Sequence, residues 1–405
     1  MSLRDLMGDW SDTELPVPEV KARGPVNGYA DLSPSGGKVG SGQTTNPDTQ
    51  SALDETLVLF GYDPEKFQII GNVRVRAWDS HDGTKLFHHS AEVGIRAEAL
   101  AFPALSALVA DTRVTKRTRP PKDKPKRAVV VAFSDPQVGK VSTRGGFDEL
   151  LVRVGLCYDA LEAYLRSVRP HLGVWVDLGD IVEGFESGGG PLAQHSRNDL
   201  SLMAQIDFAK QIEHAGIALT ARYAKETIVG GVASNHARWR SGKTDLGRAE
   251  DDWGIFIVKQ LQQMYSVHKS KALRDIRFVL PKPDEEHIVI DVLGTRFGFA
   301  HGHRSRSAEK VGEWWTRMAM AGTSLRDAFR LVVGHFHHDR SYPVGWCPHT
   351  KRETRVDIAP TLDNGSDWFS VLGNAESDPG LLVFTVEEGR GIIDRRVLIP
   401  EGVAA

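Results

Sequence analysis

Short apolar segments alternate with helical stretches from residue 128 onward, and this alternation constrains the fold more than any other feature of the chain. Six segments are expected to be strands: residues 128–135, 172–180, 227–235, 287–294, 296–302 and 331–336. The stretches between them predict helices near residues 147–168, 199–224, 248–267 and 308–329. Such alternation is typical of a layered α/β fold. The final stretch, LLVFTVEEGRGIIDRRVLIP, predicts a hairpin across EEGRG.

The 405-residue chain is long enough for a large catalytic domain and a smaller appendage. Residues 1–52 are rich in Gly, Pro, Ser, Asp and Thr without apolar periodicity, which predicts a disordered or loosely ordered segment. Residues 53–112 read as a small α+β module: a helix capped at Ser51 or Asp54, then two strands around DSHDG. A basic, Pro-rich linker at 113–127 separates this module from the α/β domain at 128–400.

The formal net charge of -3 conceals an uneven distribution. The linker RVTKRTRPPKDKPKR carries eight Lys or Arg against one Asp, a local charge of +7 on an otherwise acidic chain. Such a run can attract a polyanion, and the alternative is a solvated tether. The sequence contains neither an apolar stretch long enough to cross a membrane nor a secretory leader, so we expect a cytoplasmic protein.

Polar side chains gather where the expected strands end. They are SDPQ at Asp135, GD at Asp180, SNH at Asn235 and His236, HGH at His301 and His303, and GHFHH at His335 to His338. Open α/β sheets place their active sites at strand ends, and desolvated polar groups there need partners or a metal. Five such ends predict one polar site.

This ordered set resembles the Asp-x-His, Gly-Asp, Gly-Asn-His, His-Gly and Gly-His-x-His motifs of calcineurin-like metallophosphoesterases, over residues 128–400. The resemblance implies a sandwich of two mixed β-sheets flanked by helices. It also implies two divalent ions, for which Mn²⁺ is the first choice and Mg²⁺, Zn²⁺ and Fe²⁺ are alternatives. In style the chain is similar to phage-encoded and double-strand-break-repair nucleases of this superfamily.

The resemblance also implies roles for single residues. The metal ligands are then Asp180 as the bridge, Asp135 and His337 at one position, and Asn235, His301 and His335 at the other. His236 would act beside the scissile phosphate and could protonate the leaving oxygen, so His236 and Asp180 are the expected catalytic residues.

Two positions depart from the family motifs. Gln137 stands where the family has a His ligand, and Ser234 stands where it has Gly. A Gln carbonyl can bind a hard ion such as Mn²⁺ or Mg²⁺, although it is a poorer ligand than imidazole for Zn²⁺ or Fe²⁺. We therefore expect Gln137 to complete a weaker, more labile metal position. Ser234 is acceptable if its φ is not positive.

Basic side chains follow two of the clusters and suit a substrate with several phosphates. The candidate substrate-binding residues are Arg238, Arg240, Lys243, His303, Arg304 and Arg306. Trp239 offers a stacking face for a base. A DNA nuclease is the favoured function, with nucleic acid as partner and a homodimer compatible with the sequence. The alternatives are a phosphatase or small-molecule phosphodiesterase, and a catalytically weak nucleic-acid-binding protein.

Overall fold

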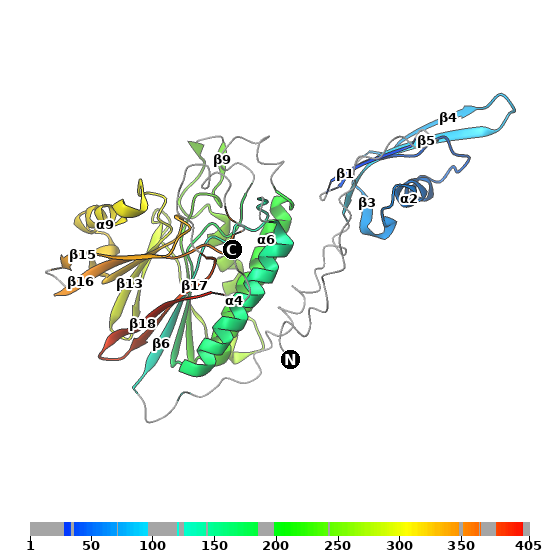
Figure 1. The fold of residues 1–405 in the computed structure, drawn as a ribbon. Helices are drawn as coiled ribbons and strands as arrows, with labels where there is room; N and C mark the ends of the chain where they lie inside the picture. Colours follow the sequence, from blue (N-terminus) through cyan, green and yellow to red (C-terminus); the bar gives the residue numbers. More distant parts are fainter. Residues whose placement is uncertain are drawn as a thin grey trace. The chain divides into compact units, whose positions relative to one another are not determined.

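The computed structural model describes residues 28–33, 36–70, 72–95, 120, 125–142, 145–184, 198–241, 244–347, 351–363, 365 and 378–399. The chain divides into two compact units, one of which comprises Arg4–Ser106 and the other Ala107–Ala405 with Met1–Leu3. Figure 1 draws the elements of each unit, and each unit is described by itself below. Most of the basic linker lies outside the described residues. Among the described helices, none has the length and apolar character to span a bilayer.

The small unit is an antiparallel sheet with one helix. Its elements are β1 (Tyr29–Ser33), β2 (Gly36–Gly40), α2 (Thr49–Leu59), η2 (Pro64–Lys66), β3 (Phe67–Ile69), β4 (Arg74–Asp79) and β5 (Lys85–Ile95). Leu53 and Leu57 on α2 are buried in one cluster with Val39 and Val93 of the sheet. The unit is therefore α+β, as the sequence predicts.

Three details of this unit differ from the sequence-based expectation. Strands β1 and β2 lie within residues 1–52, which had been expected to be loosely ordered. The side chain that caps α2 is Asp48, which accepts the N–H of Ser51, so neither Ser51 nor Asp54 is the cap. The segment expected to be the first hairpin strand divides into β3 and β4, which pair with different parts of β5.

The large unit contains two mixed sheets and a short ribbon. The six-stranded sheet has the order β11 (Arg277–Val279), β8 (Glu226–Gly231), β7 (Leu172–Asp177), β6 (Arg127–Phe133), β17 (Leu381–Glu387) and β18 (Gly391–Leu398). The five-stranded sheet has the order β12 (His287–Val292), β13 (Thr295–Ala300), β14 (Arg330–Val333), β16 (Arg352–Ile358) and β15 (Arg340–Cys347). The ribbon pairs β9 (Arg240–Ser241) with β10 (Thr244–Asp245).

Helices cover the outer faces of the two sheets (Figure 1). Contacts place α4 (Phe147–Val168), α6 (Leu202–Tyr223) and α7 (Trp253–Ser266) on the six-stranded sheet, with α8 (Lys271–Arg274) beside α6 and α7. The five-stranded sheet packs against η3 (Ala308–Lys310), α9 (Val311–Met320) and η4 (Ser324–Asp327). Between the sheets lies an apolar core that includes Val130, Val176, Phe299 and Phe384. The predicted α/β sandwich is confirmed.

The predicted strands start within about one residue of the observed ones but extend too far, because each prediction included residues of the following loop, among them polar residues in all but the strand at 287–294. The expected hairpin is confirmed as β17 and β18. The expected helix at 308–329 is instead three short elements, η3, α9 and η4. Strands β15 and β16 were not predicted, because Pro343 and Gly345 interrupt the pattern of β15 and charged residues interrupt that of β16.

The direction of the strands explains where a site can form. Strands β6, β7 and β8 run parallel to one another, and so do β13, β14 and β16 in the other sheet. Parallel neighbours end at the same edge of a sheet, which is where ligands bind in open α/β folds. The loops that follow these strands carry the polar motifs of the sequence.

Candidate metal centre

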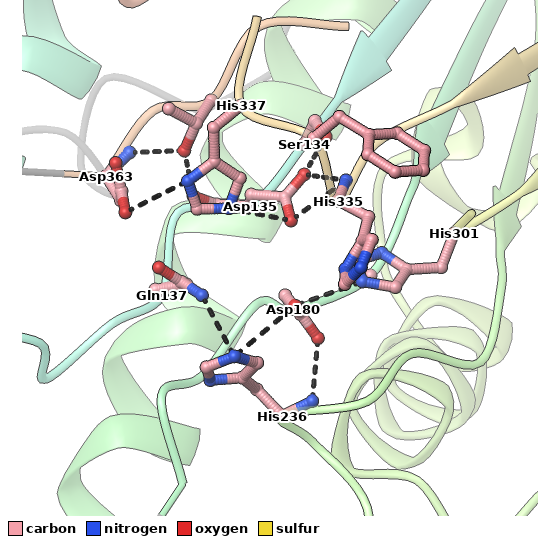
Figure 2. A network of polar contacts seen from close by, with 12 residues as sticks. Ser134, Asp135, Gln137, Asp180, His236, His301, His335, His337 and Asp363 are labelled. Carbon is pink, nitrogen blue, oxygen red and sulfur yellow. Dashed lines mark hydrogen bonds and ion pairs between the residues drawn. The ribbon is translucent and has the colours of Figure 1, made fainter. Parts of the chain in front are cut away.

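The loops after the parallel strands bring the predicted metal ligands and His236 into one polar network (Figure 2). Contacts within it join Asp180 to Asn235, His236 and His301, and join Asp135 to His335 and His337. Residues such as Asp135 and His335, which are 200 positions apart in the chain, thus become neighbours. The network spans both sheets of the sandwich.

The backbone at the site is held in an uncommon conformation. Positive φ angles occur at five predicted ligands: Asp135 (50°), Gln137 (44°), Asp180 (50°), His335 (70°) and His337 (57°). Only three other non-glycine residues of the described chain share this conformation. Non-glycine residues adopt it at a cost, and such residues cluster where geometry serves function. The five positive φ angles therefore indicate that the backbone at these strand ends is shaped for a functional site.

One group of ligand atoms already lies close enough to hold a metal ion. Oxygen or nitrogen atoms of Asp180, His301 and His335 lie within 4.8 Å of one another. Nε2 of His301 is 3.0 Å from Oδ2 of Asp180 and 2.8 Å from Oδ1 of Asn235, which adds an amide oxygen to the group. One carboxylate, one amide and two imidazoles are a donor set that suits Mn²⁺, Fe²⁺ or Zn²⁺. These residues fit a divalent ion.

Hydrogen bonds orient these donors. Nδ1 of His301 is 2.8 Å from the carbonyl oxygen of Leu178, and because a carbonyl only accepts, Nδ1 carries a proton and Nε2 faces the site. Oδ1 of Asp180 accepts the N–H groups of Asn235 (3.1 Å) and His236 (2.8 Å). The Asp180 carboxylate therefore fixes the loop that carries Asn235 and His236.

Electrostatics hold Asp180 and His335 in metal-binding form, whereas His301 must release a proton to bind an ion. Burial alone would raise the pKa of Asp180, but the neighbouring His301 and His236 hold it well below the usual range. Burial and the nearby charge of His301 lower the pKa of His335 to about 3, so its imidazole is neutral. For His301 burial opposes protonation, yet the Asp180 carboxylate raises the pKa to about 9.

The second group of predicted ligands centres on Asp135. Its carboxylate is fully buried and accepts the N–H of His335, at 3.2 Å from Oδ1 and 3.0 Å from Oδ2, and the hydroxyl of Ser134. Nε2 of His337 lies 3.5 Å from Oδ1 of Asp135. Gly334 permits this approach, because a Cβ there would collide with Ser134 and with the carboxylate itself.

Gln137 does not face the network in the way the sequence suggested. Its Oε1 accepts a hydrogen bond of 2.6 Å from Nζ of Lys140. Since an ammonium group only donates, the amide oxygen must point to Lys140 and the amide nitrogen to the site, 3.5 Å from Nε2 of His236. Lys140 also pairs with the buried carboxylate of Asp363. Sequence reasoning had assigned neither Lys140 nor Asp363 a role.

His236 lies beside the ligands as expected. Its Nε2 is 4.0 Å from Oδ2 of Asp180, and its Nδ1 is 3.1 Å from Oε2 of Glu183, a residue the sequence had not singled out. Burial lowers the pKa of His236, but Glu183 and Asp180 together raise it to about 9. At neutral pH the ring is therefore protonated and can donate a proton.

The second departure from the family motifs, Ser234, is accommodated. Ser234 is not among the described residues with positive φ, and its N–H and hydroxyl donate to Asp252, at 2.9 and 3.1 Å. The neighbouring Gly179 must remain glycine, because its φ is +95° and a Cβ would lie 2.5 Å from Cβ of Ser234. Asp177, at the end of β7, accepts the N–H of Gly179 at 2.8 Å.

The candidate substrate-binding residues are only partly brought together. Glu286, which the sequence analysis missed, accepts from Arg238 and Arg304, and Nε2 of His303 lies 3.5 Å from it. Arg306 is exposed. Lys243 and the side chain of Arg240 lie outside the described residues. Two of the predicted arginines are therefore neutralised in part by one carboxylate.

The residues that sequence reasoning missed had weak signals. Asp363 follows β16, so it is a sixth polar strand end, but the strand itself was not predicted. Lys140 reaches Gln137 through a turn in which the N–H of Lys140 donates to the carbonyl of Gln137, at 3.0 Å. The residue pattern does not predict that turn, whose first residue, Gln137, has a positive φ.

The comparison with family models and the comparison with curated proteins gave no match. Among solved structures, Vps29 from Entamoeba histolytica, crystallised as the wild type complexed with zinc, shares 11% identity at a TM-score of 0.28, over 67% of this chain and 99% of that chain. A conserved uncharacterized protein of Streptococcus pneumoniae, described as a predicted phosphoesterase, shares 9% identity at a TM-score of 0.24, over 68% and 99%. Identities and TM-scores this low carry no inference about the function of this chain.

Replacing Asp180 by Ala is expected to abolish metal binding at this group and to reduce kcat/KM by more than about 100-fold. Removing a residue that only supports a metal ligand costs roughly 10- to 100-fold, and Asp180 is both a ligand candidate and the anchor of the Asn235–His236 loop. Calorimetric Mn²⁺ titration and steady-state kinetics measure the two effects.

His338→Ala is the matched control, because His338 belongs to the same GHFHH run but directs Nδ1 to the carbonyl of Phe336, at 2.8 Å. Its variant should keep metal affinity and activity within about threefold of the parent. An Asp180→Ala protein that binds Mn²⁺ and turns over like the His338→Ala control would contradict the assignment.

Proposed function

We propose that the chain is a metal-dependent phosphoesterase of the calcineurin-like kind that hydrolyses phosphodiester bonds, with nucleic acid as its substrate. The observation that carries the proposal is the group of Asp180, His301 and His335, whose ligand atoms lie within 4.8 Å, with His236 alongside. The ordered strand-end motifs of the sequence support the same reading.

A divalent ion at Asp180, Asn235, His301 and His335 would supply Lewis-acid chemistry, polarising a phosphoryl oxygen and lowering the pKa of a bound water. Mn²⁺ is the proposed ion, since the donors mix two imidazoles with two oxygens. The contribution of the protein is to hold these donors in place before substrate arrives. Buried carboxylates and backbone amides do this work, so little reorganisation is needed on binding.

His236 is proposed as the acid that protonates the leaving oxygen. Glu183 contacts Nδ1 at 3.1 Å, which orients the ring and leaves Nε2 directed to the site. The Nε2 atom lies 4.0 Å from Asp180, so His236 is beside the metal position without belonging to the donor group. Protonated at neutral pH, it can give its proton to an alkoxide as the P–O bond breaks.

Nucleic acid is favoured as the substrate by the surface next to His236. Trp239 is 53% exposed and its ring centroid lies 5.3 Å from that of Trp253, so one face rests on protein and the other side is open. An exposed, supported indole is a platform on which a base can stack. Arg238 and Arg304 add two positive charges against the one carboxylate of Glu286.

A phosphatase or a small-molecule phosphodiesterase is the second candidate, because the same metal group would serve either reaction. The buried side chain of Arg238 and its pairing with Glu286 favour this alternative, since they limit the basic surface available to a long polyanion. A catalytically weak nucleic-acid-binding protein is the third candidate. A protein that binds no metal ion in solution would support it.

The proposed function is tested by assaying Mn²⁺-loaded protein on single- and double-stranded DNA, on RNA, on a chromogenic phosphodiester and on a chromogenic phosphomonoester. We expect cleavage of the chromogenic diester and of at least one nucleic acid, and loss of both after chelation of the metal. Rapid hydrolysis of the monoester with no cleavage of any nucleic acid would replace the nuclease by the phosphatase.

Trp239→Ala should weaken nucleic-acid binding by roughly 5- to 150-fold, because stacking of one base on an aromatic ring contributes about 1–3 kcal/mol. The chromogenic diester lacks that base and should be cleaved at the rate of the parent. Fluorescence anisotropy with a short single strand measures the affinity. Trp346→Ala is the control, since Trp346 is also exposed (66%) but lies on β15. Equal affinities in both variants would exclude Trp239 from binding.

A further inference from the structure

A lysine stands beside the second predicted metal position. Lys140 has only 14% of its side chain exposed, and its ammonium group contacts Oε1 of Gln137 at 2.6 Å and Oδ2 of Asp363. Asp363 is fully buried, and its Oδ2 also lies 3.5 Å from Nδ1 of His337. Figure 2 shows Asp363, His337 and Asp135 in sequence along one side of the network, with Gln137 between them and His236. A fixed positive charge is thus joined to the ligands expected to hold an ion.

The backbone fixes this lysine in place. The N–H groups of Gln137 and Val138 donate to the carbonyls of Asp180 and Ile181, at 2.9 and 3.0 Å, so the loop after β6 pairs with the loop after β7. The turn from Gln137 to Lys140 then folds the lysine back over the glutamine. The position of Lys140 is therefore part of the fold of this loop.

Asp363 is held as firmly. Its N–H donates to Oγ1 of Thr361 (2.9 Å), and its Oδ1 accepts the N–H of Gly365 (2.9 Å). The same Thr361 hydroxyl donates to the carbonyl of Asp135, at 2.8 Å, and Arg153 donates to the carbonyl of Leu362, at 2.9 Å. The carboxylate is consequently aimed at Lys140 and His337 by the loop after β16, and a buried carboxylate so placed requires a positive partner.

This arrangement removes one ligand, Gln137, from the second metal position. The amide oxygen of Gln137 is the only atom of that side chain that can bind a metal. It points to the ammonium group of Lys140, and the amide nitrogen faces the site instead. Among the described residues, the one group of three or more His, Cys, Asp and Glu ligand atoms within 4.8 Å is Asp180, His301 and His335. The second position keeps Asp135, His337 and the shared Asp180, but among the described residues these three do not form a group with ligand atoms within 4.8 Å of one another, so it is less preformed than the first.

We propose that the protein binds one divalent ion tightly, at Asp180, Asn235, His301 and His335, and that the ammonium group of Lys140 supplies the positive charge that a second ion supplies in two-metal sites. This inference rests on the proposed function, since it concerns the same site. Lys140 is then a positioning residue: it neutralises Asp363 and, through Gln137 and Asp363, holds the amide and His337 in their present orientation. The two-ion expectation from the sequence gives way to one ion and one ammonium group.

The test is the number of ions per chain. Chelator-treated full-length protein is titrated with Mn²⁺ in a calorimeter, and the metal content after dialysis is measured by atomic emission. The parent should bind one ion, and its electron paramagnetic resonance should be that of isolated Mn²⁺ without spin coupling. A parent that binds two ions with affinities within about tenfold, or shows a spin-coupled pair, overturns the proposal.

Substitutions of Lys140 separate the effect of its charge from the effect of its shape. Lys140→Met removes the charge and releases Gln137 and Asp363, so a second ion should bind at least about tenfold more tightly, and further still in Lys140→Met/Gln137→His. Lys140→Arg keeps the charge and should retain one ion. Lys210→Met on α6, where the lysine pairs only with Asp207 in the described contacts, is the control and should also retain one ion. An unchanged second affinity in folded Lys140→Met overturns the proposal; if that variant does not fold, the parent's stoichiometry and resonance spectrum decide.

Failure of this inference differs from failure of the proposed function. A parent that takes up two ions and hydrolyses phosphodiesters contradicts the role of Lys140 and leaves the phosphoesterase assignment standing. A parent that takes up one ion but hydrolyses no phosphoester contradicts the assignment and leaves the ion count standing.

Discussion

The carboxylate of Asp180 is the point on which the rest of the site depends. It is 1% exposed, it accepts two backbone N–H groups from the loop after β8, and it lies 3.0 Å from His301 of the other sheet. Three strand ends are therefore tied to one buried charge. Such a charge is stable only if it is compensated, which explains why imidazoles surround it and why a cation fits there.

Packing sets this arrangement before any ligand arrives. An apolar core lies between the two sheets. The parallel strands of both sheets lead into loops that contact one another at the edge of this core. Glycines at 179 and 334 allow the loops to approach where a side chain would collide. The positive φ angles of five predicted ligands show that local preference is overruled at these loops, as is common where geometry serves function. The two sheets thus form a rigid scaffold, and the strand-end loops that carry the predicted ligands are strained but held in one conformation.

The sequence predicts the ligands at the strand ends well where a polar residue follows an apolar strand directly. Asp135, Asp180, His301 and His335 each lie within three residues of the end of a buried strand, so periodicity alone places them together. Asp363 could not be placed in this way, because β16 carries alternating charges and was not recognised as a strand. The orientation of Gln137 depends on a turn and on a distant carboxylate, and neither leaves a pattern in the residues.

Charge balance joins the two halves of the site. On one side two imidazoles and an amide surround Asp180, which suits a divalent ion, and on the other Lys140 is paired with Asp363. Anomalous diffraction from crystals of the Mn²⁺-loaded protein tests this account most directly. It predicts one strong peak in contact with Asp180, His301 and His335. A map without a peak at these residues would contradict the account.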